Sequence, residues 1–445
     1  VFEVPLVSTV VLLLEKEKDQ EKRNSNIVKF ISVGENINVL DLLKVVRNED
    51  INIDARKIEI EQEKLKEQDS WFMFFKYKKP PIFWNNDIFV PLSTFFDVSK
   101  GNTQWHIEEA QGTGADNFFF LDTETAMSFN MELNKLQRAV RNTRDVIYFT
   151  LKENDIKENE SKDRPTYFFT RNEPKQNLEP WAQKYIKWGE SPGCKGSESK
   201  GGSICSESKT CRSREKNQKY GYWYNLGYIK STLFLATYSG WNKTRFTLNN
   251  VNDLVLGHSL LAFFPKDGIS IKNNDLLAIL AYLNSSYAQL YIELKGRKTG
   301  GGAIALEVNI ANEMPVPDIR KLNESTKEKL ASLFLELDNK AREIKGAISK
   351  LQLNQLADVI DNIDSVIDKL LENTQGYVPL SIVKSVLKEF MDKRRADSGD
   401  VNNPIVGTEK DELITNKKKR SRRVKIEPSS TLDKFSENDQ ENDHK

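Results

Sequence analysis

Hydrophobic and polar positions change their period along the chain, and these periods predict its strands and helices. Val4–Lys16 is apolar and β-branched before it turns charged, which predicts a strand buried on both faces. Asn26–Val33 is its predicted partner, across the charged turn between them. Short apolar or aromatic runs predict further strands at Phe118–Leu121, Tyr167–Phe169, Leu233–Tyr238, Leu254–Phe264 and Ala303–Val308.

Beyond Leu322, apolar residues repeat every three or four positions, which is typical of amphipathic helices. The repeat predicts a long helix from Leu330 to Leu351, a second at Leu356–Leu371 and a third from Pro379 to about Arg395. Earlier in the chain, helices are predicted at Val39–Arg47, Glu179–Trp188 and Leu276–Leu283. Residues Leu133–Tyr148 are predicted to form a helix that runs into a strand. Residues Leu151–Arg164 are predicted to form a charged loop.

Composition limits the class of protein. A chain of 445 residues with 29% charged and 38% hydrophobic residues suits two or three soluble domains. The net charge of +1 means that any nucleic-acid surface must come from local clustering of basic residues. The longest apolar run, Val4–Leu14, is too short to span a bilayer and follows no basic leader, so we expect no membrane contact. The first residue is Val1, which suggests either a fragment or a non-standard start codon.

The three cysteines lie in a segment of unusual composition. Residues 189–217 are rich in glycine, serine and lysine, with no apolar residue other than Ile204, which predicts a flexible basic loop. So few cysteines argue against a disulfide scaffold and fit a reducing cytoplasm, where we expect the protein to reside. Zinc needs four ligands in tighter pairs, so we predict no metal, and the only candidate ligands are Cys194, Cys205 and Cys211. The same loop is alternatively one that follows a DNA strand.

A basic and glycine-rich element follows the apolar run that ends at Leu283. Consecutive glycines let a backbone approach a bulky partner, and lysine or arginine beside them suits contact with phosphate. The residues that would make this approach are Lys295, Arg297, Lys298, Gly300, Gly301 and Gly302. From the residue chemistry alone, a mobile surface loop with solvated charges explains the same pattern.

The order of these pieces resembles the C-terminal target-recognition region of adenine-specific DNA methyltransferases. The resemblance is to the type II restriction-modification group with a TaqI-like specificity domain. It rests on the turn Leu283–Tyr287, the loop Lys295–Gly302, the strand that follows and the exit at Pro315 and Pro317. It covers roughly Val4 to Glu372, and it implies double-stranded DNA as the partner.

Two further motifs carry this resemblance. Gln111–Leu121 is similar to the Thr-Gly-Ala-Asn signature that opens the recognition domain, although Asp116 interrupts it. The resemblance therefore implies that Thr113 and Gly114 face DNA, and a plain hairpin turn is the alternative. Lys243 and Arg245 resemble the basic residue before an inner strand of that domain, with solvated charge as the alternative.

The resemblance implies an α+β chain in four parts. Residues 1–69 would be the last β-hairpin and connecting helix of a methyltransferase α/β sheet, and residues 70–320 a mixed α/β target-recognition domain that includes the loop 189–217. Residues 321–395 would form a helical region, followed by a disordered charged tail at 396–445. The basic cluster Lys417–Arg423 in that tail would add nonspecific DNA affinity or solubility.

The catalytic motifs of the family are missing from the sequence. Adenine methyltransferases carry Asn or Asp before Pro-Pro and an aromatic residue, whereas here Lys79 precedes Pro80 and Ile82 follows Pro81. A lysine cannot accept a hydrogen bond from the adenine amino group. We therefore expect no catalytic or cofactor-binding residue and no methyl transfer by this chain alone. S-adenosylmethionine is expected for a complete enzyme, which needs a catalytic partner chain or the missing N-terminal part.

A second interpretation comes from a different class of protein. The chain would then be a stand-alone DNA-binding protein of specificity-subunit type, and its helices would serve as a spacer between partner subunits.

Overall fold

The computed structural model describes most of the chain, and every structural statement below concerns the described residues. These are residues 12–33, 39–47, 49, 55–65, 71–75, 83–84, 86–101, 113–194, 204–216, 221–227, 229–299, 302–374 and 376–396. The predicted disordered tail, the Lys417–Arg423 cluster and the Lys79–Ile82 motif lie outside the described residues.

The N-terminal part is a two-stranded hairpin with a helix between its strands. Strand β1 (Ile27–Val33) pairs antiparallel with β2 (Ala55–Glu61). Helix α1 (Gln20–Ser25) precedes the hairpin, and α2 (Val39–Arg47) lies between its strands in the sequence. The prediction that β1 pairs with a strand at Val4–Lys16 was wrong, because β1 pairs with β2 and residues 12–16 form no strand. Residues 1–11 lie outside the described residues. The sequence of β2 reads as charged, yet Ile58 and Ile60 alternate onto its buried face.

A five-stranded sheet forms the middle of the molecule. Its strand order is β4-β13-β9-β11-β7, antiparallel except for the β11–β7 pair. The strands are β4 Phe96–Lys100, β13 Leu260–Pro265, β9 Phe234–Thr237, β11 Phe246–Asn249 and β7 Thr150–Leu151. The strands predicted from Leu233–Tyr238 and from the second half of Leu254–Phe264 are therefore confirmed. Their apolar runs contain no polar alternation because both faces of this sheet are covered.

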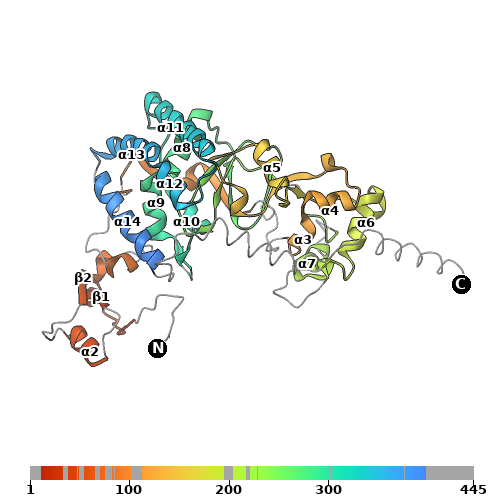
Figure 1. Cartoon of the computed structure of the whole chain (residues 1–445). Coiled ribbons are helices and arrows are strands. Elements are labelled where there is room, and N and C mark those ends of the chain that lie inside the picture. The colour runs from red at the N-terminus through yellow and green to blue at the C-terminus, as the bar shows by residue number, and fades with distance from the viewer. Residues whose placement is uncertain are drawn as a thin grey trace, which may run out of the picture.

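A layer of helices covers one side of this sheet (Figure 1). Helix α8 is buried from Asp275 to Leu283, because α9, α11 and α13 pack around it. The helices of this layer are α8 Asn273–Leu283, α9 Ser286–Lys295, α10 Val308–Asn312, α11 Glu324–Glu343, α12 Lys350–Gln355, α13 Ala357–Leu371 and α14 Leu380–Ala396. The predicted Leu330–Leu351 helix is divided, since Lys345 and Gly346 take positive φ angles and end α11. The other two predicted C-terminal helices are confirmed.

A second lobe extends from the opposite side of the central sheet (Figure 1). It is built on a four-stranded sheet of order β12-β6-β8-β5, with strands Val255–Leu256, Gln137–Val140, Tyr167–Phe168 and Phe120–Leu121. Its helices are α3 Asp116–Phe119, α4 Thr123–Ser128, α6 Pro180–Gly189 and α7 Lys209–Lys216, and α5 Glu153–Glu160 lies between the lobes. Three predictions were wrong here. Strand β6 replaces the expected helix, α5 replaces the expected loop, and α3 contains the first two residues of the strand expected at Phe118–Leu121.

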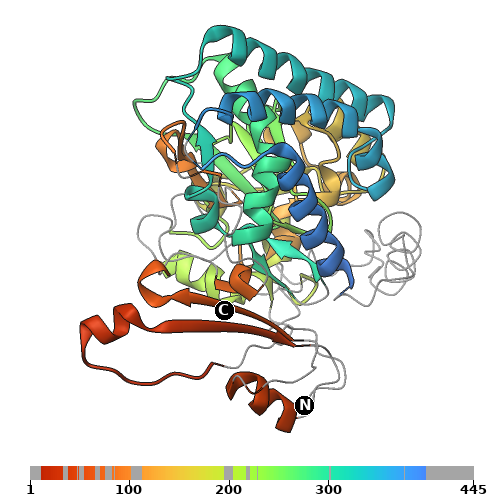
Figure 2. The ribbon, with the colours of Figure 1, turned by 90° about the vertical axis from the view of Figure 1, so that its left-hand side faces the viewer.

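The remaining strands tie distant segments together. Strand β3 pairs with β16, so the Pro-x-Pro exit is fixed against the residues that lead into β4; their bounds are Phe89–Pro91 and Pro315–Pro317. A view turned by 90° shows α14 crossing in front of the helical layer and the β1–β2 hairpin below it (Figure 2). The fold is thus a mixed α+β arrangement, as predicted. Within the described part of the chain, no helix is long and apolar enough to cross a membrane.

Candidate nucleic-acid interface

The turn between α8 and α9 anchors this region to the central sheet. The Asn284 side chain accepts a hydrogen bond from the Phe246 N–H at 3.1 Å and donates one to the Phe246 carbonyl at 2.9 Å. Ser285 caps α9 by accepting from the Ala288 N–H at 3.2 Å. The compact turn predicted here is confirmed, and it fixes the start of α9 relative to β11.

A three-stranded sheet follows the end of α9. Its order is β10-β15-β14, with strands Ser239–Gly240, Ile304–Ala305 and Arg297–Lys298. A Cβ at Gly296 would lie 2.5 Å from the Ile292 carbonyl oxygen, so only glycine lets the chain leave the helix this closely. The predicted Ala303–Val308 strand is confirmed over two residues, and Val308 already begins α10. Lys295 is half-buried at the end of α9, and Gly300 and Gly301 lie outside the described residues.

A buried ion pair joins α14 to α9, next to this sheet. The Arg394 guanidinium donates to both carboxylate oxygens of Glu293, at 3.1 and 2.8 Å, and both side chains are buried. Its Nη1 also donates to the carbonyl of Trp241 at 2.9 Å and to that of Gly302 at 2.6 Å. One arginine therefore holds the turn after β10 and the end of the glycine loop in a single arrangement. The sequence analysis did not predict this clamp.

A cluster of polar groups lies on the same sheet. The Glu307 carboxylate accepts from the Tyr238 hydroxyl at 2.7 Å and from Arg297 Nε at 2.6 Å. Burial raises the pKa of Glu307, but these two hydrogen bonds outweigh it and hold the pKa below its ordinary value. The Lys100 ammonium lies 3.8 Å from the centre of the Tyr238 ring. Arg297 stays exposed despite its ion pair, whereas the Lys298 ammonium lies 5.6 Å from the Phe390 ring of α14.

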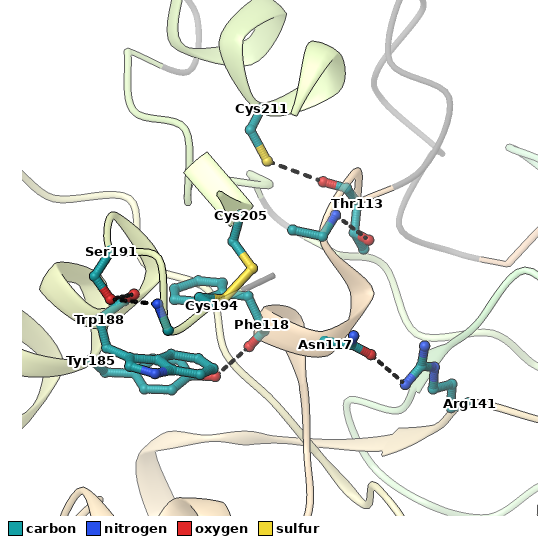
Figure 3. Close-up of a disulfide and its surroundings, with 12 residues drawn as sticks. Thr113, Asn117, Phe118, Arg141, Tyr185, Trp188, Ser191, Cys194, Cys205 and Cys211 are labelled. Atoms are coloured by element: carbon teal, nitrogen blue, oxygen red, sulfur yellow. Dashed lines mark hydrogen bonds between the residues drawn. A yellow bond between two sulfur atoms is a disulfide. The ribbon is translucent and has the colours of Figure 1, made fainter. Parts of the chain in front are cut away.

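Hydrogen bonds continue from this cluster toward the second lobe. The Tyr238 N–H donates to the Ser259 carbonyl at 3.1 Å, and the Ser259 hydroxyl donates to the Arg141 carbonyl at 2.8 Å. Arg141 in turn donates to the Asn117 side chain of α3 at 3.4 Å (Figure 3). We name this connected set the interlobe track: Arg297, Tyr238, Lys100, Ser259 and Arg141. The track connects two regions that were predicted separately, the basic strand β14 and helix α3, through hydrogen bonds.

Thr113 and Gly114 have a structural role. Thr113 is fully buried, and its backbone carbonyl accepts a hydrogen bond from Arg214 Nη2 at 2.8 Å. Gly114 has a φ of +75°, and a Cβ there would lie 2.6 Å from the Thr210 side chain of α7. The prediction that Thr113 faces a DNA groove was wrong, because α7 covers this turn.

Arg245 is also held inside the protein, and Lys243 is half-buried. Arg245 is buried and donates to the carbonyls of Ala347, at 3.1 Å, and Val146. Burial without a carboxylate partner lowers its pKa to about 10. Burial also lowers the pKa of Lys243, with Asp364 acting in the opposite direction. The prediction that Arg245 contacts DNA was wrong, since its guanidinium joins the central sheet to the turn between α11 and α12.

The cysteine segment is part of the core of the second lobe. Cys194 and Cys205 form a disulfide with a Cα–Cα distance of 5.5 Å, and Cys211 is a buried free thiol (Figure 3). All three lie in one apolar cluster with the stacked rings of Phe118 and Tyr185. The expectations of a flexible loop and of no disulfide were wrong for the described residues 189–194 and 204–216. These residues have few apolar side chains of their own, and they pack instead against aromatic residues of the second lobe.

Burial raises the pKa of the Cys211 thiol, and its sulfur lies 3.5 Å from the Thr113 carbonyl oxygen. Across the described ranges, no group of three or more His, Cys, Asp or Glu side chains is placed to hold a metal ion.

Comparison with known families places this arrangement. Residues 97–362, more than half of the chain, match the model of a family described as type II methyltransferase M.Eco57I, C-terminal domain. The chain belongs to this family. The M.Eco57I C-terminal match includes the three-stranded sheet and the interlobe track, and it ends before α14. The relationship to type II methyltransferases that the sequence predicted is therefore confirmed.

The match to solved structures is remote. The type IIG restriction endonuclease BpuSI matches with a TM-score of 0.41 and 12% identity, over 84% of this chain and 40% of the BpuSI chain. This chain thus spans about 40% of the length of that enzyme. The search of curated proteins finds no significant match.

Proposed function

We propose that the chain is the DNA-binding target-recognition part of a site-specific adenine N6 DNA methyltransferase. The observation that carries the proposal is the three-stranded sheet, which lies within the matched family region and presents Arg297 and Lys298 exposed at one edge. Exposed basic residues on a strand pair, followed in the sequence by three glycines, suit contact with the phosphates of a duplex. The family supports the type II methyltransferase context, and the resemblance in motif order supports adenine as the target base.

The interlobe track extends the surface available to DNA. Lys100 and Arg141 lie along it between the basic sheet and the second lobe, and each keeps part of its side chain in solvent. Their nearby anions are Glu307 and Asp116, so the track keeps an excess of positive charge over its length. We propose that the duplex backbone follows this track, and that the two lobes hold the duplex from two sides.

The chemistry of methyl transfer would come from outside this chain. The sequence offers no residue set for S-adenosylmethionine or for the adenine amino group, so the cofactor belongs to the complete enzyme in this proposal. The partner would be a catalytic methyltransferase chain or further N-terminal sequence. In such enzymes the target base leaves the stack to reach a catalytic pocket. The role proposed for this chain is to hold the duplex while that happens.

The alternative of a subunit spacer is less well supported. Its motivation was the apolar stripe of the C-terminal helices, yet Leu330, Phe334 and Leu337 of α11 are buried within the chain. Helix α13 likewise packs against α8, α9 and α11. A stripe that is already covered is not free to separate two partner subunits.

Fluorescence anisotropy with labelled duplexes tests the proposed function. The chain should bind duplex DNA, and glutamine at Lys295, Arg297 and Lys298 together should weaken binding to all duplexes by a similar factor. The same substitution at Lys162, which pairs with Glu158 on the surface of α5, is the matched control. Absence of DNA binding by the chain, with the fold intact by circular dichroism, would contradict the proposal.

The choice of target base needs a separate measurement. The chain, supplied with its catalytic partner and S-adenosylmethionine, should yield N6-methyladenine in nucleosides from digested DNA. Methylcytosine as the product would overturn the adenine assignment and leave the DNA-binding role in place.

A further inference from the structure

Trp241 is an exposed aromatic residue on a backbone that is held from several directions. Its side chain is 55% exposed, although tryptophan is usually well covered in folded proteins. It directly follows β10, the strand at one edge of the three-stranded sheet. The opposite edge of that sheet is β14, which carries Arg297 and Lys298. An exposed tryptophan and two cations therefore share one small sheet.

The backbone around Trp241 cannot move freely. Arg394 donates to the Trp241 carbonyl at 2.9 Å, and the Asn242 side chain donates to the Ile348 carbonyl at 2.8 Å. The Thr244 N–H then donates to the Gln289 side chain at 2.9 Å. Hydrogen bonds to α14, to the turn between α11 and α12 and to α9 thus fix the five residues between β10 and β11. Such fixation lowers the entropy cost of using the exposed ring as a contact.

The backbone just before Trp241 is open on its Cβ side. At Gly240, the residue before Trp241, a Cβ would find no atom within 4 Å. The clamp that holds the Trp241 carbonyl also holds the Gly302 carbonyl, so the backbone at Trp241 and at Gly302 keeps a constant relation. Single exposed apolar residues are common on protein surfaces. A fixed tryptophan beside a glycine loop and two cations is a more specific arrangement, and it matches how proteins combine stacking with phosphate contacts.

We propose that Trp241 stacks on a nucleobase of bound duplex DNA, entering at one base step while the basic residues of the sheet contact the neighbouring phosphates. This proposal rests on the proposed DNA-binding function and adds a base contact to it. Entry of an aromatic wedge partly unstacks a base step and bends the duplex. Stacking tolerates any base, so Trp241 would contribute mainly to affinity and to DNA distortion rather than to sequence choice.

The test uses the whole chain and duplexes with 2-aminopurine placed at successive positions. With the wild-type chain at saturation, 2-aminopurine fluorescence should change at one step, because Trp241 replaces a neighbouring base as the stacking partner there. Trp241→Ala should abolish that change and weaken binding about 5- to 150-fold, the range expected for loss of one base stack. Trp241→Phe should keep most of both effects, whereas Trp241→Leu, which is apolar but not aromatic, should not.

Controls separate this proposal from the broader function. Trp71→Ala removes another exposed tryptophan, 43% exposed in the N-terminal part, and should leave the 2-aminopurine signal unchanged. Equal fluorescence and affinity in wild type and Trp241→Ala would overturn the stacking proposal, while continued DNA binding would leave the proposed function standing. Loss of binding to a catalytic partner chain, without any change in DNA affinity, would instead identify Trp241 as a protein contact and also overturn it. Absence of DNA binding by the wild-type chain would contradict both.

Discussion

Replacing Arg394 by methionine should destabilise the protein strongly, because it leaves Glu293 buried without its partner. The pair is 3% and 0% exposed at the two side chains, so neither charge is well solvated. Breaking a buried pair from one side costs about 3–5 kcal/mol of unfolding free energy. The two carbonyls of Trp241 and Gly302 lose their charged donor at the same time.

The double variant Glu293→Met with Arg394→Met isolates the origin of that cost. It removes both charges, so what remains is the loss of two hydrogen bonds to carbonyls, about 1–3 kcal/mol. The single variant should therefore be less stable than the double variant. Lys388→Met is the surface control, since Lys388 is 81% exposed and its pair with Asp392 should contribute less than about 1 kcal/mol.

Urea unfolding followed by circular dichroism and tryptophan fluorescence measures these differences. Hydrogen exchange at the amides near Trp241 and Thr299 should also accelerate in the Arg394→Met variant, since both lie in segments that the clamp holds. A cost below about 1 kcal/mol for the single variant would refute the reasoning. So would a double variant that is less stable than the single one.

Three further predictions concern other parts of the fold. Reduction of the Cys194–Cys205 disulfide, which joins residues 11 apart, should lower stability by about 3 kcal/mol, and an unchanged melting temperature with reductant would contradict this. Asn284→Ala should cost about 3 kcal/mol in urea unfolding because it leaves the Phe246 N–H and carbonyl without partners; a cost like that of an exposed asparagine would argue against it. For Glu307, burial raises the pKa but hydrogen bonds lower it more, so the folded pKa lies below its ordinary 4.5. The stability advantage over Glu307→Gln should then be full above about pH 5 and should shrink as pH falls below 4.5, and an equal advantage at pH 7 and pH 4 would contradict that.

The local sequence pattern correctly predicted those helices and strands that bury one definite face or nearly their whole surface. The stripe of α13 and the continuous apolar run of α8 both appear in the sequence because each helix buries a definite face or its whole surface. β2 and α5 were missed for the opposite reason. Their sequences are dominated by charge, and their apolar contribution is limited to Ile58 and Ile60 in one case and Ile156 in the other. Whether such a segment becomes a strand or a helix depends on its packing against the rest of the fold.

The candidate site was predicted less completely. The sequence marked Arg297 and Lys298 through their glycine neighbours, and the structure keeps both exposed. Composition alone cannot distinguish a solvated arginine from one that donates to buried carbonyls, so Arg245 was misread and Arg394 was overlooked. Glu293 did carry a signal, because it is a lone acidic residue in the apolar run of α9. A buried charge of this kind requires a partner.

The cysteine segment shows a related limit of composition. Residues 189–217 have almost no apolar side chains of their own, which is why they resembled a flexible loop. Their cysteines instead complete a core supplied by distant aromatic residues, among them Phe118 and Tyr185. Only the three-dimensional fold reveals which other segment provides that core.

The salt dependence of DNA affinity tests the central claim most directly. The logarithm of affinity falls linearly with the logarithm of salt concentration, with a slope near one unit for each phosphate contact. Two multiple variants should be compared with wild type and with a control that carries the same chemical change elsewhere. The sheet variant has glutamine at Lys295, Arg297 and Lys298, the track variant at Lys100 and Arg141, and the control at Lys162 and Lys388.

If the duplex backbone follows the basic sheet and the interlobe track, the slope should fall by about three units in the sheet variant and about two in the track variant. The control should keep the wild-type slope, because Lys162, in the turn after α5, pairs with Glu158 of that helix, and Lys388 pairs with Asp392 within α14. Slopes equal to wild type in both the sheet and the track variants would contradict the account.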